Sequence, residues 1–196
     1  MKKSLLVFGL GNPGKKYEET FHNAGFQALD KLLEKLESQE TFQENKKTGC
    51  QLAKIPKKDG FWLLAKPQSF MNLSGEPLKK IIRFHRLNPA EIIIVHDDAD
   101  LPLGTLRFSF ASGSGGHKGL ESIFLQTGRQ DFHRLRIGIG RSEKSQNLKK
   151  FVLEKIPPEK MDSWQKTLEE AAAGLIFFEQ NGYEKTASQF NGRLTK

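Results

Sequence analysis

The chain has 196 residues, of which 37% are hydrophobic and 28% charged, and this composition excludes a disordered chain and suits one domain with a full core. Its formal net charge of +8 favours a polyanionic partner, with nucleic acid ahead of an anionic membrane surface. Cys50 is the only cysteine, which excludes a disulfide framework and fits a reducing cytoplasm. The apolar part of "MKKSLLVFGL" is too short for a signal peptide, and we expect no membrane span.

The first third of the chain predicts strands and one amphipathic helix. The apolar run Leu5–Gly9 predicts a buried strand, and a helix is expected to open near Thr20. The apolar face of that helix is formed by Phe26, Leu29, Leu32, Leu33 and Leu36. Residues 38–48 are polar and predict a loop, whereas Cys50–Ile55 and Phe61–Ala65 predict two strands.

Predicted helices and strands alternate along the rest of the chain. The segment "NLSGEPLKKIIRFHR" predicts a helix with capping residues at its start, and Ile92–Val95 predicts a central strand. "HDDADLPLG" and "ASGSGG" predict loops. The later elements are expected at Thr105–Phe110 (strand), His117–Gln126 (helix), His133–Gly140 (strand) and Pro158–Asn181 (helix). This order predicts a single α/β domain over residues 1–196, a three-layer α/β/α arrangement with a mixed, mostly parallel twisted sheet.

Gly9, Gly11 and Gly14 have the spacing G-x-G-x-x-G directly after the first predicted strand. A dinucleotide-binding turn would open a helix inside this motif, but Pro13 removes a backbone donor there. The acidic residue expected at the end of a second strand is also missing. The glycines therefore favour a tight loop at the carboxyl edge of the strand, with Asn12 displayed over a site.

Two separated residues suggest acid–base chemistry. His22 lies near the start of the first helix and is a natural general base, although a histidine there is more often part of a helix end. Asp97 follows the central strand, so the fold class places it at the same edge, where it would orient an imidazole. Asp97, Asp98 and Asp100 also suggest a Mg²⁺ site, which we rank below a polar turn. Because no G-x-S-x-G motif is present, water is favoured as the nucleophile over a covalent intermediate.

Two loops that enter helices supply further candidates. In "KPQSFMNLSG", Phe70 and Met71 suit either a core or an apolar wall, and Asn72 suits either an N-cap or an amide offered to a substrate carbonyl. In "GSGGHKGL", the glycine-rich loop suits either a linker or a mobile lid that brings His117 and Lys118 to a polyanionic ligand.

Five motifs together resemble the bacterial-type peptidyl-tRNA hydrolase family. They are "GLGNPGKKYEETFHNAG", "KPQSFMNLSG", "IIIVHDDADLPLG", "GSGGHKGL" and "FHRLRIGIGR", in the family's order, and "FVLEKIPPEK" follows them. The resemblance implies a monomeric α/β domain that hydrolyses the ester between a peptide and the 3′ end of tRNA and releases the tRNA for reuse in translation. This scheme requires no metal or organic cofactor, and no membrane partner.

By that resemblance, His22 corresponds to the base that activates water, and Asp97 to the carboxylate that supports it. Asn12 corresponds to the residue that helps select N-blocked from free aminoacyl-tRNA. The positions that the resemblance assigns to the substrate and the tRNA are Tyr17, Phe70, Met71, Asn72, His117, Lys118, Arg107 and Arg136.

This chain departs from the family's pattern at two positions. Lys118 stands where the family commonly has Asn, so a cation that only donates replaces an amide that donates and accepts. Ser109 aligns with a basic member of the clamp for the tRNA 5′ phosphate, and Arg107, two residues away on the same strand face, is its alternative. Two rival functions stay open: a non-catalytic RNA-binding relative, and a metal-dependent phosphodiesterase that uses the acidic cluster.

Overall fold

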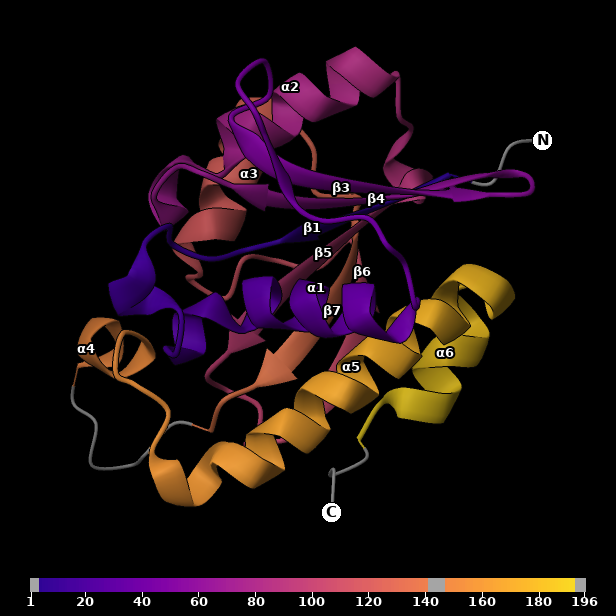
Figure 1. The fold of residues 1–196 in the computed structure, drawn as a ribbon. Coiled ribbons are helices and arrows are strands. Elements are labelled where there is room, and N and C mark those ends of the chain that lie inside the picture. Colours follow the sequence, from indigo (N-terminus) through magenta and orange to yellow (C-terminus); the bar gives the residue numbers. More distant parts are fainter. Residues whose placement is uncertain (1–3, 141–146, 193–196) are drawn as a thin grey trace.

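The computed structural model describes residues 4–140 and 147–192, which form one seven-stranded sheet with helices on both faces (Figure 1). The spatial order of the strands is β2-β3-β4-β1-β5-β7-β6. Strands β4, β1, β5 and β7 pair in parallel at the centre, whereas β3 and β6 run opposite to the rest. The strand bounds are β1 Leu5–Gly9, β2 Gln43–Asn45, β3 Cys50–Lys57, β4 Gly60–Pro67, β5 Ile92–Asp98, β6 Leu106–Phe110 and β7 His133–Gly138.

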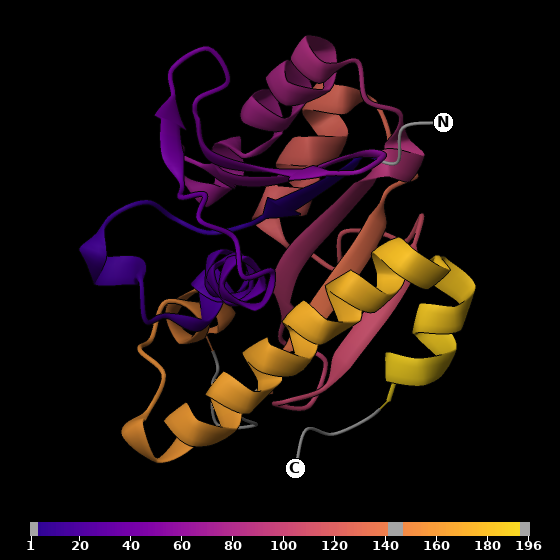
Figure 2. The ribbon, with the colours of Figure 1, turned by 45° about the vertical axis from the view of Figure 1, so that its right-hand side comes forward.

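Two pairs of helices cover the two faces of the sheet. Helices α1 and α5 pack together on one face, and α2 and α3 pack together on the other (Figure 1, Figure 2). None of the helices in the described part of the chain is long and apolar enough to cross a membrane. The helix bounds are α1 Ala24–Lys35, α2 Gly75–His85, α3 Lys118–Thr127, α4 Leu148–Val152, α5 Met161–Asn181 and α6 Tyr183–Phe190.

Alternation along the central strands builds two cores. Val7 and Val95 are buried with the α1 and α5 side chains, whereas Leu6 and Ile94 are buried with those of α2 and α3. Successive residues of a strand point to opposite faces, so a strand covered on both sides must be apolar throughout. The strand at Leu5–Gly9 and the central position of Ile92–Val95 are thus confirmed.

Three local predictions differ from the structure. The predicted loop at 38–48 contains β2, a short edge strand without an apolar face that could have signalled it. Strand β5 extends to Asp98, into the predicted loop, because β7 pairs with it along that length. The predicted side-chain cap of α2 is also wrong: Ser74 Oγ donates to Met71 O at 2.8 Å, and Gly75 N at the helix start donates to Ser122 Oγ at 3.0 Å.

Glycines at the end of β1 and in the first turn of α1 allow a close approach of α1 to the sheet. A Cβ atom on Gly25 would collide with Leu10 N and with Val95 O, and one on Gly9 would collide with Gly25 O. Only glycine fits where backbones come this close. The helix start is therefore pressed against the carboxyl ends of β1 and β5, and the preceding residues are placed at that edge. Residues 1–3, which open "MKKSLLVFGL", and Arg141, which ends the fifth motif, lie outside the described residues.

Candidate active site

Three chain segments bring a carboxylate and two imidazoles together at the carboxyl edge of the sheet. Asp97 lies near the end of β5, His22 lies in the short 3-10 helix η2 (Phe21–Asn23) before α1, and His117 is the N-cap of α3. His22 Nδ1 lies 3.0 Å from Asp97 Oδ1 and 3.1 Å from Oδ2. His117 Nε2 lies 3.0 Å from Asp97 Oδ1, and the two imidazole rings are 5.1 Å apart.

The hydrogen bonds fix the tautomers of both histidines. Burial by itself would raise the pKa of Asp97, but His22 and His117 more than offset this effect and hold that pKa well below its ordinary value. An ionised carboxylate only accepts, so both ring nitrogens that face it carry a proton. His117 Nδ1 accepts from Gly119 N at 3.1 Å, which agrees with a proton on Nε2. His22 is left with a lone pair on Nε2.

The same carboxylate adjusts the basicity of His22. Burial would lower the pKa of the imidazole, but the charge of Asp97 and its hydrogen bond outweigh that effect and raise the pKa above its ordinary value. A histidine with a raised pKa is a stronger base. The pair is thus suited to take a proton from water and to hold the resulting imidazolium.

Asn12 is held rigidly beside this cluster. Its backbone N donates to Asn23 Oδ1 at 2.8 Å, and its carbonyl accepts from Asn23 Nδ2 at 3.0 Å. Its side-chain Oδ1 accepts from Met71 N at 2.8 Å. Because Oδ1 is occupied in this way, the amide Nδ2 is the group that Asn12 can offer as a donor to a ligand.

The three carboxylates of "HDDAD" do not converge. Asp97 faces the two histidines, whereas Asp98 Oδ2 accepts from Arg136 Nε at 2.7 Å and Asp98 Oδ1 accepts from Asp100 N at 3.0 Å. Asp100 is exposed. A Mg²⁺ site for phosphodiester chemistry needs several oxygens around one point, so this arrangement does not favour that rival function.

His22, Asp97 and His117 are nevertheless a potential metal-binding group, since their ligand atoms lie within 4.8 Å of one another. A neutral imidazole that binds a metal through Nε2 carries its proton on Nδ1 and donates it to an acceptor. The N–H of Gly119 already donates to Nδ1 of His117, so that nitrogen acts as an acceptor here. The cluster therefore fits a proton-handling network better than a metal centre.

The predicted phosphate clamp lies on two neighbouring strands. Arg107 of β6 is the cross-strand partner of Arg136 of β7, whereas Ser109 is the partner of Arg134. Directly opposite residues lie within about 5.5 Å of each other. Arg107 is exposed and Ser109 Oγ is within hydrogen-bond distance of Ser112 Oγ, so Arg107 is the better partner for Arg136.

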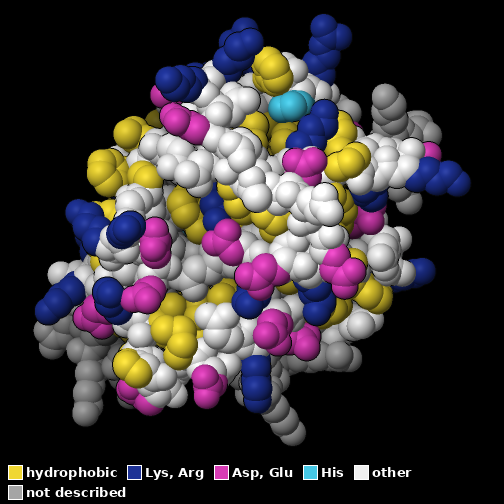
Figure 3. Space-filling view, viewed as in Figure 1, with side chains coloured by type: hydrophobic (Ala, Val, Ile, Leu, Met, Phe, Trp, Pro, Cys, Tyr) yellow, Lys and Arg dark blue, Asp and Glu magenta, His cyan; other side chains and the backbone are white. Residues whose placement is uncertain are grey.

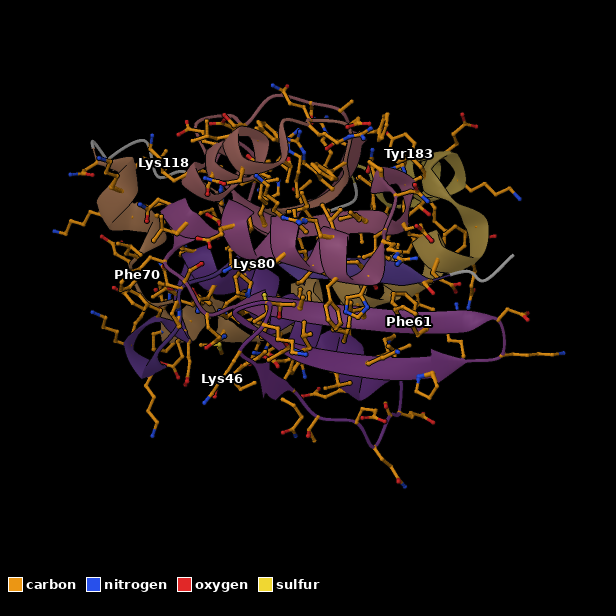
Figure 4. All side chains as sticks on the ribbon, turned by 90° about the horizontal axis from the view of Figure 1, so that it is seen from above. Lys46, Phe61, Phe70, Lys80, Lys118 and Tyr183 are labelled. Carbon is orange, nitrogen blue, oxygen red and sulfur yellow. The ribbon has the colours of Figure 1, made fainter. Side chains whose placement is uncertain are left out.

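The residues predicted to contact the substrate differ in exposure. Met71 is buried, whereas Phe70 is 55% exposed and Asn72 is exposed in the 3-10 helix η3 (Met71–Leu73). Lys118 Nζ pairs with Glu121 Oε2 at 2.8 Å and is exposed; Phe70 and Lys118 mark the same end of the molecule in Figure 4. Tyr17, in the 3-10 helix η1 (Lys15–Tyr17), is half-buried, with Lys16 Nζ 4.7 Å from its ring centre.

Three supporting residues escaped the sequence analysis. Arg134 is buried and donates to the carbonyls of Ser112 and Gly113, which anchors the glycine-rich loop before His117. Asn23 fixes the backbone of Asn12. His96 is buried, donates from Nδ1 to Asp97 O at 2.7 Å and packs edge-on against His117. The one available signal was the position of Arg134 inside a predicted strand, because a buried charge requires a polar partner.

Burial also decides the chemistry of the single cysteine. It raises the pKa of the Cys50 thiol to about 12, so the thiolate needed for nucleophilic attack is not formed near neutral pH. This agrees with water as the nucleophile. The fold and the site together define a class of protein: a single-sheet α/β protein with a hydrogen-bonded His–Asp pair at the carboxyl edge of its central strand.

Comparison with known proteins narrows the class to a family. The family model for peptidyl-tRNA hydrolase matches residues 6–196, and the chain belongs to that family. It is 38% identical over 195 residues to a peptidyl-tRNA hydrolase of Desulfovibrio desulfuricans (97% of this chain, 85% of the relative) and 42% identical over 171 residues to one of Aquifex aeolicus (87% and 88%). The crystal structure of peptidyl-tRNA hydrolase from Acinetobacter baumannii superposes with a TM-score of 0.90 at 30% identity, covering 100% of this chain and 98% of that one.

Proposed function

We propose that this protein hydrolyses the ester between a peptide, or an N-blocked amino acid, and the 3′ end of tRNA. The observation that carries the proposal is the contact of His22 Nδ1 with the buried Asp97 carboxylate at 3.0 Å, which leaves His22 Nε2 as a base. Membership of the peptidyl-tRNA hydrolase family supports the substrate class. The product is free tRNA, available again for translation.

In the first step, His22 Nε2 takes a proton from water while the water oxygen attacks the carbonyl carbon of the ester. Asp97 stabilises the imidazolium that forms. The Asn12 Nδ2 group and the exposed Asn72 amide would donate to the oxyanion of the tetrahedral intermediate. When the intermediate collapses, the bond to the ribose oxygen breaks and the proton on His22 passes to that oxygen.

Different contacts would supply the affinity for tRNA and the selectivity for the N-blocked substrate. Arg136 and Arg107 would bind the 5′ phosphate of tRNA, a contact that does not depend on sequence and so accepts many tRNAs. Asn12 would help distinguish an N-blocked from a free amino group, and Met71 would form a wall of the peptide groove. Tyr17, Phe70 and His117 would contact the substrate end, and Lys118 would add a cation beside it.

We further infer that one copy of the chain is sufficient, as a single domain over residues 1–196. His22, Asn12, Asp97 and His117 come together within one chain, which supports a monomeric enzyme. A substrate released during translation and a lone unpaired cysteine support a cytoplasmic location.

The test is hydrolysis of an N-acetyl-aminoacyl-tRNA and of the free aminoacyl-tRNA, with EDTA present, by the wild type and by His22→Ala. We expect the wild type to release the N-acetyl amino acid and to spare the free-amine substrate. His22→Ala should lower the rate by about 10²–10⁴-fold, the usual worth of a general base, while tRNA binding is largely kept. Bound but intact substrate with the wild type would instead indicate a non-catalytic RNA-binding relative, and cleavage abolished by EDTA would indicate a metal-dependent enzyme.

A further inference from the structure

A row of three rings and two lysines crosses the end of α2, away from the His22–Asp97 pair. Lys47 Nζ lies 5.9 Å from the centre of the Phe84 ring, and the Phe84 and His85 rings are 5.0 Å apart. The His85 ring is 6.2 Å from that of Phe61, over which Lys54 Nζ lies at 4.5 Å. We call these five residues the α2 row. It joins the turn before β3, strands β3 and β4, and the last turn of α2.

The row contributes little to the cores. Phe84 is 57% exposed and belongs to neither buried cluster, and Phe61 packs only partly against the core beneath α2. Burial, together with nearby Lys54, lowers the pKa of His85, so its ring is neutral near pH 7. An exposed phenylalanine on a helix end does not stabilise the fold by burial, which leaves its ring face available to a ligand.

Cations around the row lack carboxylate partners. Lys46, Lys79, Arg83 and Arg86 are exposed, and within residues 4–140 and 147–192 neither they nor the lysines of the row have a carboxylate within 4.0 Å. Other surface lysines do pair with acids: Lys80 of α2 pairs with Glu76 at 2.8 Å, and Lys155 pairs with Glu19 at 2.9 Å. In Figure 3, Lys and Arg side chains surround a hydrophobic side chain and a histidine at the top, over α2. The unpaired charge indicates an anionic partner.

We propose that the α2 row binds a stretch of single-stranded RNA at a site separate from the catalytic one. Unpaired bases stack on aromatic rings, and the phosphates between them are neutralised by flanking lysines. Helix α2 has 11 residues, so about 15 Å of helix separates Gly75, which closely follows η3, from the row. Figure 4 shows Phe61 well apart from Phe70 and Lys118.

The pattern favours RNA over the other anionic partners. An acidic peptide would satisfy the lysines but leave the rings without a matching surface. A membrane would require a broad apolar face, whereas Phe84 is one exposed ring among cations. Three neighbouring rings between two lysines suit stacked bases whose phosphates are neutralised on either side.

The experiment measures binding of a fluorescein-labelled twelve-nucleotide oligouridylate by anisotropy, with the full chain at several salt concentrations. We expect Phe84→Ala to weaken binding at least fivefold, because one base loses its stacking partner. Lys47→Ala should reduce the slope of log affinity against log salt by about 0.7, the value for one phosphate contact on a single strand. The matched control is Leu125→Ala, because Leu125 is an apolar side chain of α3 that is 80% exposed and lies outside the row.

Hydrolysis of N-acetyl-aminoacyl-tRNA is measured for each variant, to distinguish an effect on the α2 row from an effect on the catalytic site. His22→Ala should bind the oligonucleotide as the wild type does. Three results would overturn the proposal: no binding by the wild type at low salt, equal binding by wild type and Phe84→Ala, or equal losses for Leu125→Ala and Phe84→Ala. If Phe84→Ala instead loses only binding to vesicles of anionic phospholipid, the surface serves a membrane.

Discussion

The cluster of His22, Asp97 and His117 and the α2 row hold their charges in opposite ways. Asp97 is buried, and both imidazoles that flank it are fixed by hydrogen bonds of about 3 Å. Lys47 and Lys54 are exposed and lie over the rings of Phe84 and Phe61. A buried charge interacts strongly over a fixed distance, whereas exposed charges act over a longer range and are screened by salt. Changes in the cluster should therefore alter chemistry and its pH dependence, and changes at the surface should alter binding and its salt dependence.

The largest effect is expected from Asp97→Asn, which removes the charge that raises the pKa of His22. Hydrolysis should fall by about 10²–10⁴-fold, because the imidazolium loses its counter-charge. The acid limb of kcat/KM, where His22 becomes protonated and inactive, should move to lower pH. Burial lowers the pKa of His22, and without the Asp97 charge this effect is no longer offset. A pH profile with N-acetyl-aminoacyl-tRNA measures the rate and the position of the acid limb. An unmoved acid limb would show that Asp97 does not raise the pKa of His22.

Asn12→Asp should have the next largest effect. Aspartate keeps an oxygen to accept from Met71 N but loses the Nδ2 donor, so the packing is preserved while one substrate contact is lost. We expect kcat to fall by about 10²-fold, the usual cost of one oxyanion donor. The preference for N-acetyl over free aminoacyl-tRNA should also narrow, because the new carboxylate attracts a free ammonium group. Comparison of kcat/KM for both substrates decides this; unchanged selectivity would contradict the assigned role.

The phosphate clamp should show the behaviour of surface charges. Arg136→Ala and Arg107→Ala should each weaken tRNA binding and reduce the slope of log affinity against log salt by about 0.9, as one lost phosphate contact does. Ser109→Ala, on the same strand as Arg107, is the control and should leave the slope unchanged. Filter binding of uncharged tRNA at several salt concentrations gives these slopes. A flattened slope for Ser109→Ala alone would move the clamp to that position.

The smallest effect is expected from Lys118→Asn, which restores the residue that the family commonly has. The lysine ammonium pairs with Glu121 at 2.8 Å on an exposed helix surface, so its removal should change hydrolysis by less than about threefold. Glu121→Gln, which frees the same ammonium, should have an equally small effect. Steady-state kinetics at low and physiological salt measures both variants, and a loss above tenfold would place Lys118 among the residues that contact the reacting ester.

Much of the architecture could be predicted because the central strands are buried on both faces. The sequences of such strands are continuous apolar runs, which is why the strands at Leu5–Gly9 and Ile92–Val95 could be predicted. Edge strand β2 was missed because its exposed residues carry no apolar pattern. The expected side-chain cap of α2 was wrong because a residue distant in the sequence, Ser122, accepts from the backbone at the helix start instead.

The sequence by itself determined the fold class, the order of the central strands along the chain and the residue types available for water activation. Tertiary structure decided which of these residues meet. His22 and His117 both contact the Asp97 carboxylate, and Asp98 pairs with Arg136. Among the residues that the structure describes, the tertiary packing also left the lysines of the α2 row without a carboxylate within 4.0 Å. Hydrophobic patterning is local and repeats along the chain, whereas charge pairing depends on distances between segments that only the packed sheet and helices set.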